Sequence, residues 1–135
     1  MWEIIENAIK YEEQDSGLLG YLDSPFLPFA PKRLYWISNV PDLHVRGNHA
    51  HKQLSQFIWA ATGEATLELI DKKMNREEIE LTAGRLVIIK PGVWRVIKKF
   101  TNDAVICVGA DSIYDESDYI REWQDFTEWI ATNEG

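Results

Sequence analysis

Cysteine and histidine are scarce in this 135-residue sequence, with one and three copies respectively, and no long apolar run interrupts it. A single cysteine excludes a disulfide within the chain and fits a reducing cytoplasm. Cys107 lies in the apolar segment 104–108, so we expect it to pack in the core. The apolar segments are too short to span a membrane, and no signal peptide is recognisable, so we expect no membrane association.

Basic residues are also in short supply, since 14 Lys and Arg face 22 Asp and Glu and leave a formal net charge of −8. Such a charge opposes unspecific binding to nucleic acids or anionic membranes. An anionic ligand would therefore need a local cluster of Arg and Lys. Apolar side chains, by contrast, make up 45% of the chain, which indicates a folded protein. At this length we expect one domain over residues 1–135, with a substantial core.

Short segments rich in branched and aromatic residues recur along most of the chain, separated by turn residues. Residues 1–24 favour short strands or irregular structure, and Pro25, Pro28 and Pro31 then predict an extended loop. Strands are predicted at 33–38, 54–61, 65–71, 77–81, 85–90, 93–100 and 103–110, with a histidine-containing segment after the first. Seven or eight short strands at this spacing indicate an antiparallel sandwich or barrel.

In the last part of the chain, the spacing of the apolar residues changes from that of a strand to that of a helix. Apolar residues at helical spacing predict one amphipathic helix over about 118–132, packed on the β-domain. These residues are Tyr119, Trp123, Phe126 and Ile130. Ser117 or Asp118 can cap the start of this helix.

All three histidines lie close together, His44 just before the pair His49 and His51. In a strand, side chains two positions apart project from the same face. Two imidazoles that titrate near neutrality would then lie side by side. Such a pair can bind a metal or move protons, or it can be two histidines without a chemical task.

A metal would need further ligands. Gln56 stands where a carboxylate is expected, no histidine follows His51, and the position after Trp94 holds Arg95, whose charge repels a metal. We therefore expect no metal. Acid–base chemistry needs only an imidazole, a second proton donor such as Tyr35, and groups that hold the substrate. The side chains that can hold phosphates are Arg33, Arg46, Lys52 and Arg95.

Two stretches of the sequence resemble the two short motifs of the cupin family. They are His49-x-His51-x4-Gln56-x6-Gly63 and Gly84-x6-Pro91-Gly92-Val93-Trp94. A closer resemblance, over about residues 28–130, is to the sugar 3,4-ketoisomerases that act on dTDP-4-keto-6-deoxyglucose. It is carried by Arg33-Leu34-Tyr35-Trp36-Ile37, by Arg46-Gly47-Asn48-His49-Ala50-His51-Lys52, by Val93-Trp94, and by Tyr114-Asp115-Glu116-Ser117-Asp118-Tyr119-Ile120-Arg121.

The resemblance implies a cupin-type antiparallel β-barrel, or jelly roll, and an isomerase that needs neither metal nor cofactor. His49 or His51 would remove a proton from C3 of the 4-keto sugar, Tyr35 or the other histidine would stabilise the enediolate, and a proton would return at C4. The implied substrate-binding residues are Arg33, Arg46, Lys52, Gln56 and Arg95. Family members are homodimers, and the N-terminal segment of this chain could pair with a partner chain.

Two departures from the family pattern bear on the product. Some members carry Asp-Ser-Arg-Gly where this chain has Asp15-Ser16-Gly17, and those members place a histidine at the position of Arg95. Members with arginine there resemble those that form the 3-keto-gluco product, so we expect that epimer. Two other functions stay open, a cupin that binds a nucleotide sugar without turning it over and a metal-dependent cupin such as a dioxygenase.

Overall fold

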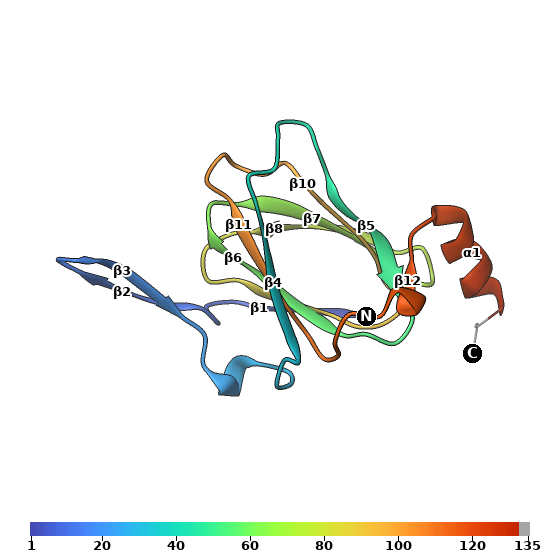
Figure 1. Cartoon of the computed structure of the whole chain (residues 1–135), viewed down its shortest axis with the longest axis horizontal. Helices are drawn as coiled ribbons and strands as arrows, with labels where there is room; N and C mark the ends of the chain where they lie inside the picture. The colour runs from blue at the N-terminus through green and yellow to red at the C-terminus, as the bar shows by residue number, and fades with distance from the viewer. Residues whose placement is uncertain (133–135) are drawn as a thin grey trace.

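Two five-stranded antiparallel sheets face each other in the computed structural model, which describes residues 1–132 (Figure 1). The first sheet has the order β1 (Trp2–Ile5), β9 (Leu86–Ile89), β6 (Gln56–Thr62), β11 (Val105–Ala110) and β4 (Arg33–Ser38). The second has the order β12 (Tyr119–Ile120), β5 (Arg46–His51), β10 (Trp94–Lys98), β7 (Ala65–Ile70) and β8 (Arg76–Leu81). The predicted antiparallel β-fold is confirmed.

The N-terminal residues form a separate hairpin of β2 (Lys10–Gln14) and β3 (Gly17–Tyr21), which projects away from the two sheets (Figure 1). A short 3-10 helix, η1 (Ser24–Phe26), follows the hairpin. It contains Pro25, which was predicted to lie in an extended loop. Proline is tolerated there because the first residues of a helix need no backbone N–H donor.

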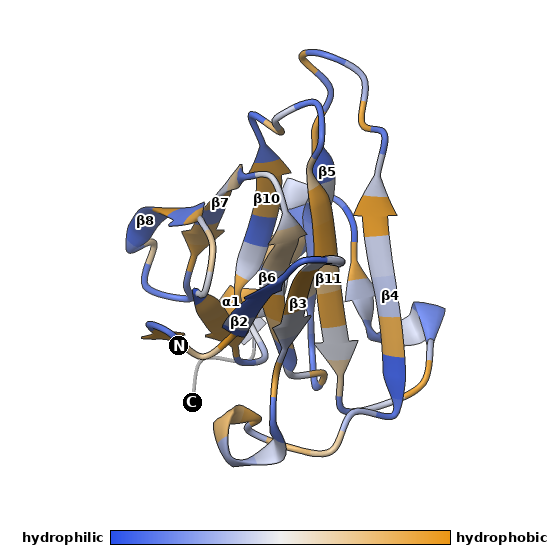
Figure 2. Ribbon diagram, turned by 90° about the vertical axis from the view of Figure 1, so that its left-hand side faces the viewer, coloured by the Kyte–Doolittle hydropathy of each residue, from blue (hydrophilic) through white to orange (hydrophobic). Residues whose placement is uncertain are grey.

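The core lies between the sheets and is built from side chains that alternate along the strands. Leu81, Val87 and Ile106 are fully buried in it. On β4, Tyr35 and Ile37 pack against this core, whereas Leu34 and Trp36 are exposed. Figure 2 shows the apolar character of β11 against the polar β2 of the hairpin. Because successive side chains of a strand point to opposite faces, every second side chain reaches the interior.

The C-terminal helix, α1 (Trp123–Thr132), begins later than the sequence predicted. Residues 116–118 instead form a 3-10 helix, η2 (Glu116–Asp118), and the next two residues form β12, which pairs with β5. Ser117 and Asp118 therefore do not cap α1, and Tyr119 is not part of it. Pairing with the edge of β5 outweighs the helical spacing of the apolar residues.

The predicted docking of the helix is present. Phe126 and Ile130 of α1 are buried against Ala50, Ile70 and Trp94, on the outer face of the second sheet. None of the helices in the described part of the chain is long and apolar enough to cross a membrane.

Candidate active site

A cavity of about 570 Å³ lies between the sheets at the polar end of the interior. Six of the eight residues that the sequence singled out line it, namely Arg33, Tyr35, Arg46, His49, Gln56 and Arg95. The other two, His51 and Lys52, line a smaller neighbouring cavity of about 340 Å³. Both cavities share a wall formed by Arg33, Tyr114 and Tyr119. His44 is exposed in the loop between β4 and β5 and lines neither cavity.

The two histidines of β5 lie on one face of the strand, as their spacing predicted. Their ring centroids are 4.9 Å apart and the planes are nearly perpendicular, at 88°. The exposed fraction is 9% for His49 and 1% for His51. Both imidazoles are thus held away from bulk water, beside each other.

Gly47 allows the start of β5 to approach β10 closely. Its φ is 90°, and a Cβ at this position would lie 3.0 Å from the backbone oxygen of Arg95. Only glycine adopts such a conformation without strain. The pairing of β5 with β10 shifts register between Arg95 and Val96, and it sets Arg95 opposite His49. The backbone therefore brings the cation and the imidazole together.

Each histidine is oriented through its Nδ1 atom. Nδ1 of His49 lies 3.0 Å from the carbonyl oxygen of Gly47, and Nδ1 of His51 lies 3.1 Å from Oδ2 of Asp118. Carbonyl and carboxylate oxygens only accept hydrogen bonds, so Nδ1 is the protonated nitrogen in each neutral ring. The Nε2 atoms of both rings are buried and have no hydrogen-bond partner among residues 1–132.

The surroundings keep both imidazoles neutral. Burial, followed by the positive charge of Arg95, lowers the pKa of His49 from 6.5 to about 4. The same two causes lower the pKa of His51. The carboxylate of Asp118 acts on His51 in the opposite direction, because it favours the charged ring. A neutral imidazole with a free Nε2 lone pair can accept a proton.

Arg95 is 3% exposed and is held by uncharged partners. Its Nη1 donates to Oε1 of Gln56, and its Nη2 donates to the carbonyl oxygen of Val93 at 2.9 Å. Burial lowers the pKa of Arg95 to about 10, so the side chain stays charged at neutral pH. It is a fixed positive charge beside the histidines.

Tyr35 extends this network toward β4. Nε2 of Gln56 donates to the Tyr35 hydroxyl at 3.2 Å. Burial raises the pKa of Tyr35, and the charge of Arg95 opposes that shift only in part. The phenol is therefore protonated at neutral pH and can donate a proton or a hydrogen bond.

The larger cavity is lined by four arginines and no carboxylate, whereas Arg33 and Lys52 line the smaller cavity beside three aspartates. Neither Arg46 nor Lys52 forms an ion pair with a carboxylate of residues 1–132, so their charges are available to a ligand. The guanidinium of Arg33 lies 4.6 Å from the ring centroid of Tyr35 and 5.3 Å from that of Tyr114. Stacking on two rings orients a guanidinium without neutralising it.

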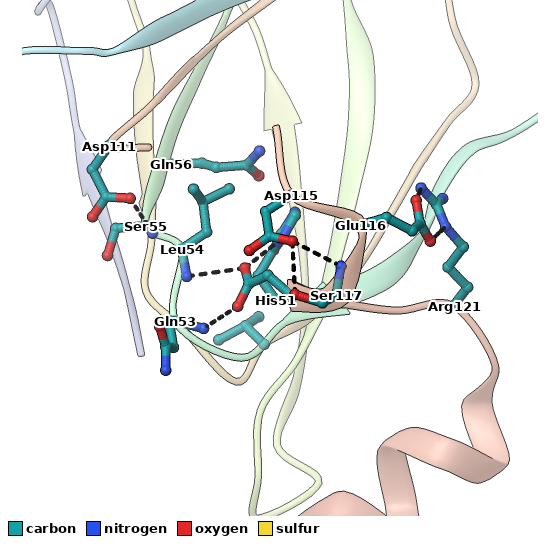
Figure 3. Close-up of polar contacts among 12 residues, drawn as sticks. His51, Gln53, Leu54, Ser55, Gln56, Asp111, Asp115, Glu116, Ser117 and Arg121 are labelled. Carbon is teal, nitrogen blue, oxygen red and sulfur yellow. Dashed lines mark hydrogen bonds and ion pairs between the residues drawn. The ribbon is translucent and has the colours of Figure 1, made fainter. Parts of the chain in front are cut away.

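The segment from η2 to β12 supplies residues that sequence reasoning did not assign to the site. The ring centroid of Tyr119 is 5.0 Å from that of His49 and 4.4 Å from that of His51. Arg121 stacks on Tyr119, 4.1 Å from its centroid, and its Nε pairs with Glu116 at 2.7 Å (Figure 3). The sequence offered a signal, because these residues belong to the stretch 114–121 that carried the resemblance.

Comparison with known proteins identifies the family. The family model "FdtA: WxcM-like, C-terminal" matches residues 4–131. The chain belongs to this family. The predicted relationship to the sugar 3,4-ketoisomerases is confirmed, and with it the cupin-type fold. No group of three or more His, Cys, Asp and Glu side chains within residues 1–132 is placed to hold a metal ion.

Three relatives of this FdtA-family chain are named as 3,4-oxoisomerases or 3,4-ketoisomerases. It is 32% identical, over 126 residues, to a TDP-4-oxo-6-deoxy-alpha-D-glucose-3,4-oxoisomerase from Aneurinibacillus thermoaerophilus, covering 93% of this chain and 90% of the relative. The crystal structure of QdtA, a sugar 3,4-ketoisomerase from Thermoanaerobacterium thermosaccharolyticum in complex with TDP, matches with a TM-score of 0.85 at 30% identity, covering 97% and 95% of the two chains. WlaRB, a TDP-quinovose 3,4-ketoisomerase from Campylobacter jejuni, matches with a TM-score of 0.80 at 31% identity, covering 94% and 97%.

Proposed function

We propose that this protein is a dTDP-sugar 3,4-ketoisomerase that moves the keto group of dTDP-4-keto-6-deoxyglucose from C4 to C3. The observation that carries the proposal is the pair of buried, neutral imidazoles on β5, beside the chain of contacts Arg95–Gln56–Tyr35. The names of the relatives support the same substrate class and reaction.

The chemistry needs a proton acceptor and a proton donor. The ketone at C4 acidifies the proton on C3, and His49 or His51 removes it through Nε2, leaving an enediolate. The positive charge of Arg95 and the hydroxyl of Tyr35 stabilise the negative oxygen. A proton then returns to C4, from Tyr35 or a protonated histidine, the proton of the C3 hydroxyl passes to the oxygen on C4, and the ketone is left at C3. No electrons enter or leave, so the reaction requires no redox cofactor.

The basic side chains at the mouth would hold the nucleotide. Arg46 of the larger cavity, Lys52 of the smaller cavity and Arg33 of both are available to the pyrophosphate of the dTDP sugar. Charge-assisted hydrogen bonds to phosphate suit both side-chain types, and arginine can form two in parallel. In an acidic chain, this local positive charge supports an anionic substrate.

We also propose that the product is the 3-keto-gluco sugar. Arg95, opposite His49, cannot exchange protons at neutral pH as a histidine in its place would. It can only bind a sugar oxygen and so restrict which face of the enediolate is protonated. Changing Arg95→His, alone and with Ser16→Arg, should alter the configuration at C4 or the ratio of epimers. If neither variant changes rate or configuration, Arg95 lies outside the reaction.

The protein is further proposed to be a homodimer. Trp36 and Leu34 on the edge strand β4 are 68% and 61% exposed, and Leu18 on the hairpin is 61% exposed. Exposed large apolar side chains on an edge strand favour pairing with another chain. Analytical ultracentrifugation should find twice the mass of 15.6 kDa, and a monomer at micromolar concentration would contradict the proposal.

The function is tested by supplying dTDP-4-keto-6-deoxyglucose and analysing the product by NMR. A 3-keto sugar with gluco configuration at C4 is expected. A 3-keto-galacto sugar would support the proposed isomerase activity but contradict the proposed configuration at C4. Recovery of unchanged substrate would overturn the isomerase itself.

A further inference from the structure

Asp118, the last residue of η2, forms a hydrogen bond to one of the two histidines. Its carboxylate accepts three hydrogen bonds from one stretch of chain: Oδ1 from the backbone N–H of Gln53 at 2.8 Å, and Oδ2 from that of Leu54 at 3.3 Å and from Nδ1 of His51 at 3.1 Å (Figure 3). The side chain of Asp118 is 16% exposed. It therefore lies against β5 rather than in solvent.

These contacts determine which nitrogen of His51 carries the proton. The backbone groups that face Asp118 are both N–H donors, so its oxygens act as acceptors toward them. The remaining contact, to Nδ1 of His51, must then also be donated to the carboxylate. Nε2 is left with a lone pair, and it has no partner among residues 1–132.

We infer that Asp118 is a positioning residue for the reaction, since it fixes His51 as the Nδ1–H tautomer with a proton-accepting Nε2. The inference rests on the proposed isomerase, and the role it gives Asp118 is exerted through His51. Once His51 becomes protonated, the carboxylate also stabilises the imidazolium. Both effects require the negative charge of Asp118 as well as its shape.

His49, on the same strand, has a backbone carbonyl in place of a carboxylate at its Nδ1. Its Nδ1 is held by the carbonyl of Gly47, two residues away on its own strand. A neutral carbonyl fixes the tautomer but offers no countercharge. His51 thus has an anionic partner that comes from 67 positions along the chain, and this contact forms only in the folded protein.

Asp118 also holds the turn at 53–54, so a loss of activity alone would not distinguish the two roles. Asp71 provides a matched control. Its Oδ1 accepts from two backbone N–H groups, those of Lys73 and Asn75, and the Asp118 carboxylate likewise accepts from two at the turn 53–54. Asp71, however, contacts no histidine and lines neither cavity. An Asp→Asn change at either position weakens a turn, and only the change at 118 affects His51.

The test is the nitrogen-15 NMR spectrum of the histidine rings, with the His51 signals assigned by His51→Asn. In the unmodified protein, Nδ1 of His51 should be protonated and Nε2 should not. In Asp118→Asn, an amide N–H2 competes for the place of one acceptor oxygen. The His51 tautomer should then become mixed, kcat should fall at least about tenfold, and KM should change little. Asp71→Asn should leave the tautomer and kcat unchanged.

An Nε2–H tautomer of His51 in the unmodified protein would overturn the inference, and this result does not depend on the folding of Asp118→Asn. An Asp118→Asn variant with unchanged kcat and an unchanged tautomer would overturn it as well. If the unmodified protein shows the expected tautomer but does not isomerise the sugar, the proposed function fails while the Asp118–His51 contact stands.

Discussion

Buried polar groups occur in two regions of the second sheet and its surroundings, and the two differ in how they are partnered. On the β7–β8 side, Thr66 donates to Glu80 at 3.1 Å, and Asp71 accepts three hydrogen bonds within its own turn. On the β5–β10 side, Nε2 of His49, Nε2 of His51 and Nε of Arg95 are buried without a partner in the described part of the chain.

The difference is the one expected if the β7–β8 groups serve stability and the β5–β10 groups contact the proposed substrate. A buried polar group without a partner destabilises a fold by about 1–3 kcal/mol, so folded proteins contain few of them. Here they lie beside the two neighbouring cavities, where a polar sugar would supply the missing partners. The β7–β8 side is accordingly expected to affect folding, and the β5–β10 side to affect turnover.

The largest effect is expected from the histidines. His49→Asn or His51→Asn, whichever removes the base, should lower kcat by about 10²–10⁴-fold with little change in dTDP affinity, because a general base contributes that much. His44→Asn serves as the control, since His44 is exposed and lines neither cavity. Near-normal turnover in both variants would remove the histidines from the acid–base role.

A core substitution away from the cavity should give the reverse result. Leu81 on β8 is fully buried and lines neither cavity. Leu81→Ala should lower the free energy of unfolding by about 2–5 kcal/mol, since it removes buried methyl groups and leaves a void. Urea denaturation measures this loss. The kcat of the folded variant should be unchanged. A fall in kcat at unchanged stability would contradict the expectation that the β7–β8 side affects folding and the β5–β10 side affects turnover.

Removing a phosphate-binding charge should have a smaller effect, and on binding only. Arg46→Ala should weaken dTDP binding by about 1.5–3 kcal/mol, roughly 10- to 150-fold, which calorimetry can measure. Arg76→Ala is the matched control, because Arg76 is an exposed arginine of β8 that pairs with Glu68. Equal dTDP affinity in the unmodified protein and Arg46→Ala would exclude Arg46 from the site.

The smallest change is expected from pH near neutrality. Because the pKa of His49 is lowered to about 4, its base form is retained as pH falls, and kcat/KM should stay level from about pH 8 to about pH 6. Stability behaves differently below pH 6.5, since the unfolded chain then binds a proton that the buried His49, with its pKa of about 4, does not. The free energy of unfolding should therefore fall between pH 6.5 and 4. An acidic limb of kcat/KM near 6.5 would show that the histidines are not shielded as described.

The sequence was sufficient to predict the β-fold and much of the site. The i and i+2 spacing of His49 and His51 requires only that β5 is a strand, and the position of Arg95 follows from the resemblance to the family. The exposure of Arg95 did not follow, because burial depends on how β10 pairs with β5 and β7. Tyr35 was predicted as a donor without its link through Gln56.

The segment 118–121 was incorrectly predicted as the start of the helix, and for a physical reason. Tyr119 has the spacing of a helical stripe with Trp123, but the edge of β5 offers backbone partners that a two-residue strand can use. That edge is 67 positions away from Asp118. Local periodicity contains no information about such a contact. The positions of Asp118 and Tyr119 beside the histidines therefore could not be predicted from it.

The central claim is that the polar end of the barrel transfers protons rather than merely holding a sugar. It is tested most directly by incubating the protein with dTDP-4-keto-6-deoxyglucose in deuterated water and following the sugar by NMR. Deuterium should enter at C4 of the 3-keto product, or at C3 of the 4-keto sugar when the enediolate returns to substrate. A 4-keto sugar that binds, by calorimetry, and yet keeps its proton at C3 and stays unconverted would contradict the claim and identify the protein as a nucleotide-sugar-binding cupin.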